Sequence, residues 1–288
     1  MSGSSARPGH SRIPRLSQHF LHDPRILDRI VDALDPRPDD VVLEIGAGRG
    51  TLTRRLAGRV AAVVAIEKDR DLVAELKRGR GAVGGRMGEA VGSLPRNVVV
   101  VGADALELDW HEALHGAPLP PAVPKIVGNI PYAITTPLID KALTPPLPER
   151  IVFLVQKEVA DRLAAGAGSK TYGALSVGVQ SVARVERLFT VRAGAFRPPP
   201  QVDSAVIRLT PLEEPLVPPA RQAAFRRFVT ALFGQRRKQL SRSLRSIAGL
   251  DRDAAERLLA RQGHAPTARP ETLTPEALAR LHDALLPP

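Results

Sequence analysis

The chain has 288 residues, 43% of them hydrophobic, which is enough for one large α/β domain with a smaller appendage. Its 41 Lys and Arg residues outnumber 30 Asp and Glu residues, and the resulting net charge of +11 indicates a polyanionic partner such as nucleic acid. The absence of cysteine excludes disulfides, thiolate metal sites and a cysteine nucleophile, and agrees with a reducing cytoplasm.

The start of the chain is polar and basic. Residues 1–15 contain no apolar segment, so we expect a flexible basic arm and no secretory signal. No run approaches the roughly 18 consecutive apolar residues of a membrane span. We therefore expect a cytoplasmic protein without a membrane partner, and we expect it to act as a monomer.

Strand-like and helix-like runs alternate after the arm. Asp23 and Pro24 are typical of a helix start, and apolar residues follow them at helical spacing. Seven runs predict strands: 41–45, 60–67, 97–104, 125–129, 150–156, 185–191 and 204–210. Because these runs are mostly apolar throughout and helical runs separate the first five, we predict an α/β fold with a mostly parallel sheet covered on both faces.

The composition also divides the chain into domains. Residues 16–212 hold all the predicted strands, and the Pro-rich stretch 213–220 has the composition of a linker. The pattern from there to the end is helical, so we predict a small all-α domain over 213–288. Residues 79–96 hold six glycines and predict a mobile surface loop.

A glycine-rich turn follows the first apolar strand. It reads Glu44-Ile-Gly46-Ala-Gly48-Arg-Gly50, and its glycines let the backbone turn tightly and approach a ligand. The spacing differs from the G-x-G-x-x-G of dinucleotide folds, which disfavours a nicotinamide enzyme. It resembles instead the first motif of class I methyltransferases, in which Gly46 and Gly48 would contact the methyl donor.

Two carboxylates follow at the ends of the next two predicted strands. Glu67, about 20 residues after the turn, is placed to accept both hydroxyls of a ribose. Asp104 is placed to accept a hydrogen bond from an adenine amine. Either residue alone is adequately explained as a solvated strand end. Two acids at consecutive strand ends favour a ligand site, because ligands bind at the carboxyl edge of such sheets.

The tetrapeptide Asn129-Ile130-Pro131-Tyr132 follows the fourth predicted strand. The N6 lone pair of adenine is delocalised into the ring, and acceptors for its hydrogens would favour a pyramidal, nucleophilic nitrogen. Asn129 can supply an amide oxygen, Pro131 can hold a carbonyl inward, and Tyr132 can stack on the base. The alternative is a simple proline turn. The expected chemistry is mainly positioning, without a metal or a strong base.

The first helices of the tail carry only positive charge. Residues 221–250 hold eight Lys or Arg residues and no Asp or Glu, while Phe225 and its apolar neighbours follow a helical stripe. Such a run is usually a solvated face, but beside this site it indicates contact with phosphates. The candidate RNA-binding residues are Arg226, Arg227, Arg236, Arg237 and Lys238.

Motifs along almost the whole chain resemble those of the KsgA family of small-subunit rRNA adenine N6,N6-dimethyltransferases. They are SQHFL (17–21), EIGAGRG (44–50), AIEKD (65–69), GADAL (102–106), GNIPY (128–132), LVQKEVADRL (154–163), AFRPPPQVDS (195–204) and FGQRRKQL (233–240). The resemblance implies a Rossmann-like class I methyltransferase fold with seven strands.

It also implies a function. S-adenosylmethionine would be the cofactor, and two adjacent adenines near the 3′ end of 16S rRNA, in a pre-30S particle, would be the substrate.

The resemblance assigns further site residues. His19, Leu21 and Gly46 would hold the donor, with Asn129 shared between donor and base. Phe196 would be a second aromatic ring against the target base, or alternatively a core residue anchored by the prolines after it. Ala47, Ile130 and Ala133 depart from the family's usual residues but leave the main acceptors intact.

Two other functions stay open at this point. An Erm-type enzyme would modify 23S rRNA, although LVQKEVADRL and the QRRKQL tail favour the small-subunit family. A non-catalytic RNA-binding assembly factor or a mitochondrial-type transcription factor would use the same fold without the chemistry. The presence of Glu67, Asp104 and Asn129 argues against that loss.

Overall fold

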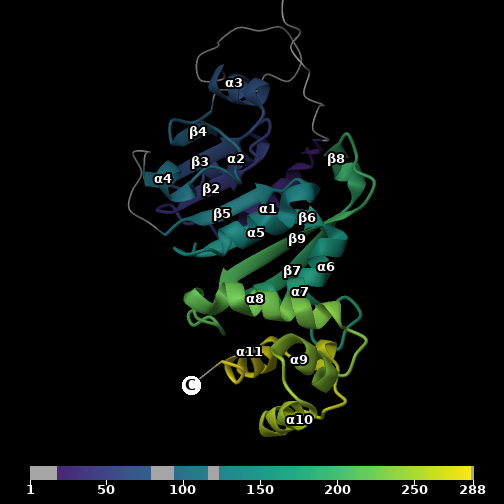
Figure 1. Ribbon diagram of the computed structural model, residues 1–288. Coiled ribbons are helices and arrows are strands. Elements are labelled where there is room, and N and C mark those ends of the chain that lie inside the picture. Colours follow the sequence, from purple (N-terminus) through teal and green to yellow (C-terminus); the bar gives the residue numbers. More distant parts are fainter. Residues whose placement is uncertain (1–17, 79–93, 116–122, 287–288) are drawn as a thin grey trace, which may run out of the picture.

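The computed structural model describes residues 18–78, 94–115 and 123–286. Its larger part is a twisted sheet with helices on both faces, and its smaller part is a group of helices beyond one edge of that sheet (Figure 1). The predicted arm, residues 1–15, and most of the predicted glycine-rich loop lie outside the described residues. Their expected mobility therefore stays a prediction.

All seven predicted strands are present in one sheet, whose order is β4-β3-β2-β5-β6-β9-β7. The strands are β2 (Val41–Ile45), β3 (Ala62–Glu67), β4 (Val98–Gly102), β5 (Lys125–Asn129), β6 (Arg150–Gln156), β7 (Ala183–Val191) and β9 (Ser204–Pro211). The five strands from β4 to β6 are parallel, and β9 runs antiparallel to both β6 and β7. The predicted mostly parallel sheet is thus confirmed.

The helices of the larger part follow the strands. They are α1 (Pro24–Leu34), α2 (Thr51–Ala57), α3 (Arg70–Arg78), α4 (Trp110–His115), α5 (Thr135–Ala142), α6 (Lys157–Leu163) and α7 (Ala174–Gln180). The expected helix start is observed, because the Asp23 carboxylate accepts hydrogen bonds from the backbone N–H groups of Arg25 and Ile26.

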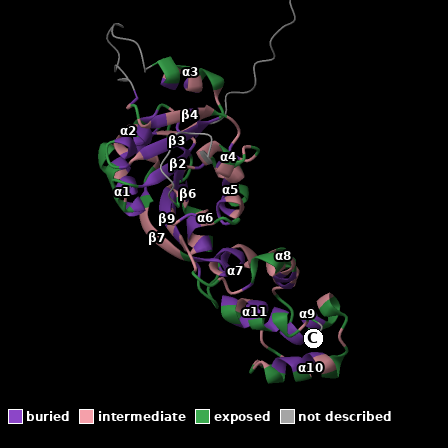
Figure 2. Cartoon of the chain, turned by 90° about the vertical axis from the view of Figure 1, so that its left-hand side faces the viewer, coloured by how far each residue is buried: buried purple, intermediate pink, exposed green. Residues whose placement is uncertain are grey.

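Alternate residues of each strand feed two separate cores, as strand geometry requires. On β2, Val42 packs in a core with α1 and α2, while Leu43 and Ile45 pack in a second core with α4, α5 and α6. Burial of both sheet faces explains why these strands are apolar throughout (Figure 2). It also leaves the carboxyl edge of the sheet as the place where polar side chains gather.

A second, two-stranded sheet was not predicted. β1 (Phe20–Leu21) pairs antiparallel with β8 (Phe196–Arg197), and the short helix η2 (Ala193–Ala195) precedes β8. Strands of two residues carry no alternation that a sequence can reveal, and these two lie 175 positions apart in register. This pairing places the start of the described chain next to β8 and the three prolines that follow it, residues 198–200.

The C-terminal region is helical, as expected, and has its own core. It contains α8 (Pro219–Gly234), α9 (Leu240–Ala248), α10 (Arg252–Arg261), η3 (Pro270–Thr272) and α11 (Pro275–Asp283). Phe225, Phe228 and Leu232 of α8 are buried in this core, as their spacing predicted. Tyr172 and Val177 also belong to it. The predicted domain boundary at residue 212 stays a prediction. Among the described residues no helix is both long and apolar enough to cross a membrane.

Candidate active site

The predicted site residues meet at the carboxyl edge of the sheet. Ile45 at the end of β2 lies in register with Ile66 of β3 on one side and Gly128 of β5 on the other. The glycine turn, Glu67 and Asn129 directly follow or end these three adjacent strands. The second predicted carboxylate, that of Asp104, lies two residues beyond the end of β4 rather than on this strand.

The glycine turn needs its glycines. Gly46, Gly48 and Gly50 have φ values of 74°, 57° and 74°, which L side chains rarely adopt. A Cβ on Gly46 would lie 3.4 Å from the carbonyl oxygen of Asn129, and one on Gly48 would lie 3.3 Å from the ring of Phe20. The turn therefore packs closely against Asn129 of β5 and Phe20 of β1, and side chains at Gly46 and Gly48 would crowd these two residues.

Glu67 fixes the turn through its backbone. Its carboxylate accepts hydrogen bonds from the N–H of Gly48 at 2.8 Å and from that of Asp69 at 2.9 Å. Each carboxylate oxygen keeps another lone pair, so both can still accept a hydroxyl. The position matches the predicted ribose site, and the role itself stays a prediction.

Asp104 is held in a defined orientation. Its carboxylate accepts from Lys68 Nζ at 2.6 Å and from the N–H of Leu106 at 2.9 Å. The hydrogen bond from Lys68 lowers the pKa of Asp104, and the N–H of Leu106 lowers it further. Asp104 is thus ionised at neutral pH and can act only as an acceptor, as recognition of an adenine amine requires.

Glu44, the first residue of the glycine-turn motif, was assigned no separate role and is buried, with 2% of its surface exposed. One of its oxygens, Oε2, has no hydrogen-bond partner among the described residues. Burial raises the pKa of Glu44 to about 8, although its neighbour Thr53 acts in the opposite direction. At neutral pH most molecules therefore carry an uncharged carboxylic acid in the wall of the site.

This shift predicts a pH-dependent stability. Between pH 4.5 and about 8 the folded chain keeps a proton on Glu44 that the unfolded chain releases, so stability falls as the pH rises through this window. Glu44→Gln removes the titration. The free energy of unfolding of Glu44→Gln, relative to that of the wild-type chain, should therefore increase by a few kcal/mol, in order of magnitude, between pH 5 and pH 8. Urea unfolding at both pH values measures it.

An exposed carboxyl provides the control for that experiment. Glu112→Gln, on α4, should change the free energy of unfolding by the same small amount at both pH values. A Glu44→Gln advantage that is equal at pH 5 and pH 8 would contradict the assignment of a buried, protonated carboxyl.

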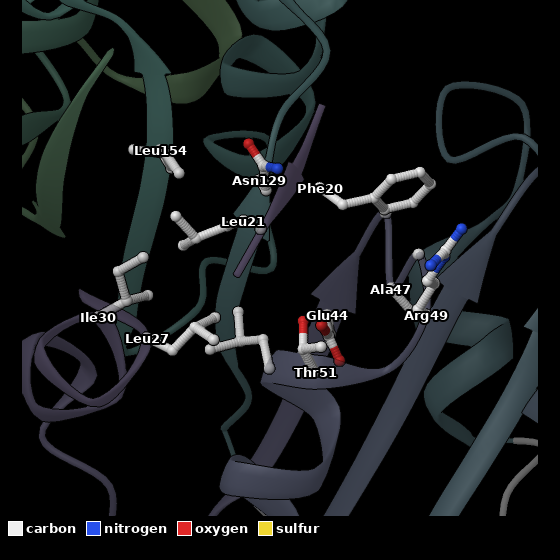
Figure 3. A pocket seen from close by; sticks show the side chains of 14 residues that line it. Phe20, Leu21, Leu27, Ile30, Glu44, Ala47, Arg49, Thr51, Asn129 and Leu154 are labelled. Atoms are coloured by element: carbon white, nitrogen blue, oxygen red, sulfur yellow. The ribbon is translucent and has the colours of Figure 1, made fainter. Parts of the chain in front are cut away.

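A pocket opens between the glycine turn and the neighbouring strands (Figure 3). Glu44 and Thr51 lie together in it, Phe20 and Arg49 lie on the side of the turn, and Leu154 lies on the opposite wall. The full lining is Phe20, Leu21, Leu27, Ile30, Glu44, Gly46, Ala47, Gly48, Arg49, Thr51, Leu52, Gly128, Asn129 and Leu154. An apolar wall beside a polar turn suits a ligand with both kinds of surface.

Asn129 enters this pocket from the end of β5 with a defined orientation. Its Nδ2 donates to the carbonyl oxygen of His19 at 3.0 Å. This hydrogen bond assigns the two amide atoms and leaves Oδ1 as an acceptor for a ligand. The sequence predicted the acceptor, but only the structure shows that residue 19 orients it.

The backbone of the tetrapeptide supplies a second acceptor. The carbonyl of Pro131 already accepts from the N–H of Ile134 at 3.1 Å and from Thr135 Oγ1 at 3.3 Å. The carbonyl of Ile130 has no such partner among the described residues. Because a residue before proline is restricted to extended conformations, Pro131 fixes the direction of that carbonyl. Of these two carbonyls, that of Ile130 is therefore the one that can still accept from a ligand, and this role stays a prediction.

Tyr132 lies in the short helix η1 (Tyr132–Ile134) and is contacted on two sides. Its ring stacks on the ring of His19, with centroids 6.3 Å apart and planes inclined by 27°. Its hydroxyl lies 2.9 Å from the hydroxyl of Ser204. The His19 ring in turn donates from Nδ1 to the carbonyl of Pro198 at 2.8 Å. The side chain of His19 thus lies at Tyr132, while its backbone holds Asn129.

Phe196 is a buried residue of the core. Its ring is only 2% exposed and belongs to the core that also contains Leu21, its partner in the two-stranded sheet. This placement agrees with the alternative interpretation, a core residue anchored by prolines. Contact between Phe196 and a target base stays a prediction.

Several residues of the site had no role in the sequence analysis. Phe20 contacts the glycine turn and lies 5.0 Å from the guanidinium of Arg49, and Ser204 contacts Tyr132. Both lie inside motifs that carried the resemblance, SQHFL and AFRPPPQVDS. Phe20 makes its contact from β1, whose pairing with β8 the sequence did not reveal, and Ser204 makes its contact from the start of β9.

The five candidate RNA-binding residues fall into two groups. Arg226 pairs with Asp140, and Arg236 pairs with Glu271 and donates to backbone carbonyls of Ser169 and Lys170. The other three, Arg227, Arg237 and Lys238, are exposed and have no acidic partner among the described residues. Only the second group keeps its whole charge available to an external phosphate.

The chain matches the model of the family described as "Ribosomal RNA adenine dimethylase" over residues 9–261. The chain belongs to this family. It is 40% identical over 283 residues to "Ribosomal RNA small subunit methyltransferase A" of Acinetobacter baylyi, covering 97% of this chain and 94% of the relative. The protein of the same name from Synechococcus elongatus is 42% identical over 268 residues, covering 90% of both chains.

Two solved structures are also similar to this chain. The 23S rRNA methyltransferase ErmE is 30% identical, with a TM-score of 0.68 over 92% of this chain and 99% of that one. A dimethyladenosine transferase from Plasmodium falciparum is 25% identical, with a TM-score of 0.72 over 91% and 96% of the two chains. The predicted class I methyltransferase fold is confirmed. The protein is therefore a methyltransferase, and not a nicotinamide enzyme.

Proposed function

We propose that this protein transfers methyl groups from S-adenosylmethionine to N6 of two adjacent adenines near the 3′ end of 16S rRNA. The product would be N6,N6-dimethyladenosine, formed in a cytoplasmic pre-30S particle by a single copy of the chain. The observation that carries the proposal is the orientation of Asn129. Its Nδ2 donates to the carbonyl oxygen of His19, so that Oδ1 is the amide atom that can accept from a ligand at the end of β5.

The residues at the carboxyl edge fit the donor. The turn offers a backbone that no Cβ obstructs, Glu67 keeps lone pairs for two ribose hydroxyls, and Asp104 is an oriented acceptor for an adenine amine. His19, Leu21, Gly46, Gly48 and Asn129 would lie along its methionine end. When bound, S-adenosylmethionine supplies a methyl group on a sulfonium centre.

The chain's own residues prepare the attacking nitrogen. Asn129 Oδ1 and the carbonyl of Ile130 accept the two N6 hydrogens, which favours a pyramidal amine with a localised lone pair. Tyr132 stacks on the flipped base and fixes its plane. Catalysis is mainly the positioning of the amine in line with the methyl group. As the N–C bond forms, the bond from the methyl carbon to sulfur would break and leave a neutral thioether. No strong base is needed, because the methylated amine is acidic enough to pass its proton to water.

The substrate is tested by mass spectrometry of rRNA nucleosides from cells with and without the gene. We expect dimethyladenosine in 16S rRNA to disappear when the gene is deleted and to return when it is restored. Unchanged dimethyladenosine in 16S rRNA after deletion would contradict the proposal.

The Erm-type function is the second candidate, because the ErmE structure is similar over almost its whole length. The two functions differ in their RNA. We expect labelled methyl groups to enter immature small subunits and to be absent from protein-free 23S rRNA. The reverse pattern would favour the Erm-type function.

We further propose that the helical domain, residues 213–288, holds RNA through its exposed cations. Each phosphate contact contributes roughly 0.7 to 0.9 to the slope of log affinity against log salt. The triple variant Arg227→Gln, Arg237→Gln, Lys238→Gln should therefore reduce that slope by about 2. Filter binding of 16S rRNA fragments between about 50 and 200 mM salt measures it.

The two paired arginines provide the matched comparison. Arg226→Gln on α8 and Arg236→Gln in the turn that follows it remove the same kind of charge from neighbouring positions, but from side chains engaged with Asp140 and Glu271. We expect their effect on the salt slope to be smaller than that of the exposed group. A larger effect would place the RNA on the side of the paired arginines.

A further inference from the structure

Tyr132 needs support from outside its own segment. The helix that carries it has three residues, and a hydrogen bond from the N–H of Ile134 to the carbonyl of Pro131 closes its turn. The tyrosine is half-buried and lies between an exposed proline and an exposed alanine. A ring on so short an element is oriented by what its hydroxyl and its faces touch.

The hydroxyl of Tyr132 touches Ser204 at 2.9 Å. Ser204 begins β9, and its backbone lies in register with Gln156 of β6 on one side and Val191 of β7 on the other. A position between two strands is among the most rigid in the fold. Ser204 is 1% exposed, so water does not replace its partner easily.

A second contact of the Tyr132 ring comes from His19, whose own ring donates a hydrogen bond to the carbonyl of Pro198. Tyr132 is thus held at its hydroxyl by β9 and at one face by the segment next to β1. We expect the other face of the ring to stack on the target base. The inclination of that face is set by the hydroxyl anchor and by His19 together.

We propose that Ser204 is a positioning residue, which sets the plane of Tyr132 and through it the plane of the target adenine. This inference rests on the proposed adenine methylation. Ser204 does not touch the reacting atoms. Its hydroxyl keeps Tyr132 in the orientation that presents N6 to Asn129, so that its loss lowers the rate of transfer without weakening the donor site.

The test is a double-mutant cycle on methyl transfer with Ser204→Ala, Tyr132→Phe and the double variant. One hydrogen bond corresponds to roughly two- to tenfold in rate. We expect each single variant to lose about that factor in kcat, and the double variant to lose no more than either single one, because both break the same contact. Affinity for S-adenosylmethionine, measured by calorimetry, should stay within twofold.

A buried serine outside the site controls for general effects of the substitution. Ser181→Ala, beyond the end of α7, removes a hydrogen bond to its own helix at Gly178 and should leave kcat unchanged. Independent losses that multiply in the double variant, or a normal kcat in either single variant, would overturn the role of Ser204. If wild-type protein itself transfers no methyl group to adenine, the proposed function fails and the role of Ser204 fails with it, whereas an active wild-type protein with unaffected variants overturns the role of Ser204 alone.

Discussion

Replacing Asn129 by alanine is expected to reduce methyl transfer at least about 100-fold, while binding of S-adenosylmethionine changes much less. The loss is large because the side chain supplies an oriented acceptor for the amine, and removal of one such preorganised group typically costs two to three orders of magnitude in kcat. The backbone carbonyl of Asn129, which lies against Gly46, is kept in the variant. A labelled-methyl assay and calorimetry measure the two quantities separately.

Asn129→Asp is the informative companion. It keeps an acceptor oxygen but loses the N–H group that donates to His19 at 3.0 Å, so it tests the orientation of the side chain rather than its presence. We expect it to be impaired as well. Near-wild-type turnover by Asn129→Ala would refute the role of the residue. Equal losses of turnover and donor affinity would assign it to the donor instead.

Removing the buried ammonium group of Lys125 is expected to cost about 3–5 kcal/mol of folding stability. Lys125 is the first residue of β5, at the opposite end from Asn129, and its side chain is fully buried. Its Nζ lies 2.6 Å from Asp40 Oδ2 and 2.6 Å from the carbonyl oxygen of Asp35. Lys125→Met leaves the carboxylate of Asp40 buried without its partner, and urea unfolding measures the cost.

Two further variants separate the ion pair from packing. Lys157→Ala removes a half-exposed lysine that pairs with Asp161, and should cost no more than about 1 kcal/mol. The double variant Lys125→Met, Asp40→Asn removes both charges and should recover part of the loss. A double variant less stable than Lys125→Met would show that packing of the lysine, rather than the unpaired acid, dominates.

The strands of the sheet could be predicted because each one depends on residue types at successive positions of the sequence. Each apolar run from 41–45 to 204–210 became a strand, since burial on both faces requires apolar residues at successive positions. The observed bounds differ for four runs: 60–67 is β3 (Ala62–Glu67), 97–104 is β4 (Val98–Gly102), 185–191 is β7 (Ala183–Val191) and 204–210 is β9 (Ser204–Pro211). Edge residues of an apolar run can be buried outside the sheet, as Val60 is.

The candidate site could be predicted for the same reason, in part. Parallel strands end at one edge, so Gly46, Glu67 and Asn129 had to lie close together once the strands were identified. The burial of Glu44 was not predicted, and for Phe196 the sequence left a core position and a contact with the base as alternatives. Both depend on which neighbours close over the side chain, and a single sequence does not contain that information.

The sequence by itself determined the strands, the glycine turn and the acceptors at the strand ends, because each follows from residue types at short spacing. Only the tertiary structure decided that His19 holds both Asn129 and Tyr132, that Ser204 reaches Tyr132, and that Arg226 and Arg236 are already paired. These contacts join residues between 35 and 113 positions apart in the chain. Such pairs meet only after the sheet and the helices have packed, so local patterns carry no record of them.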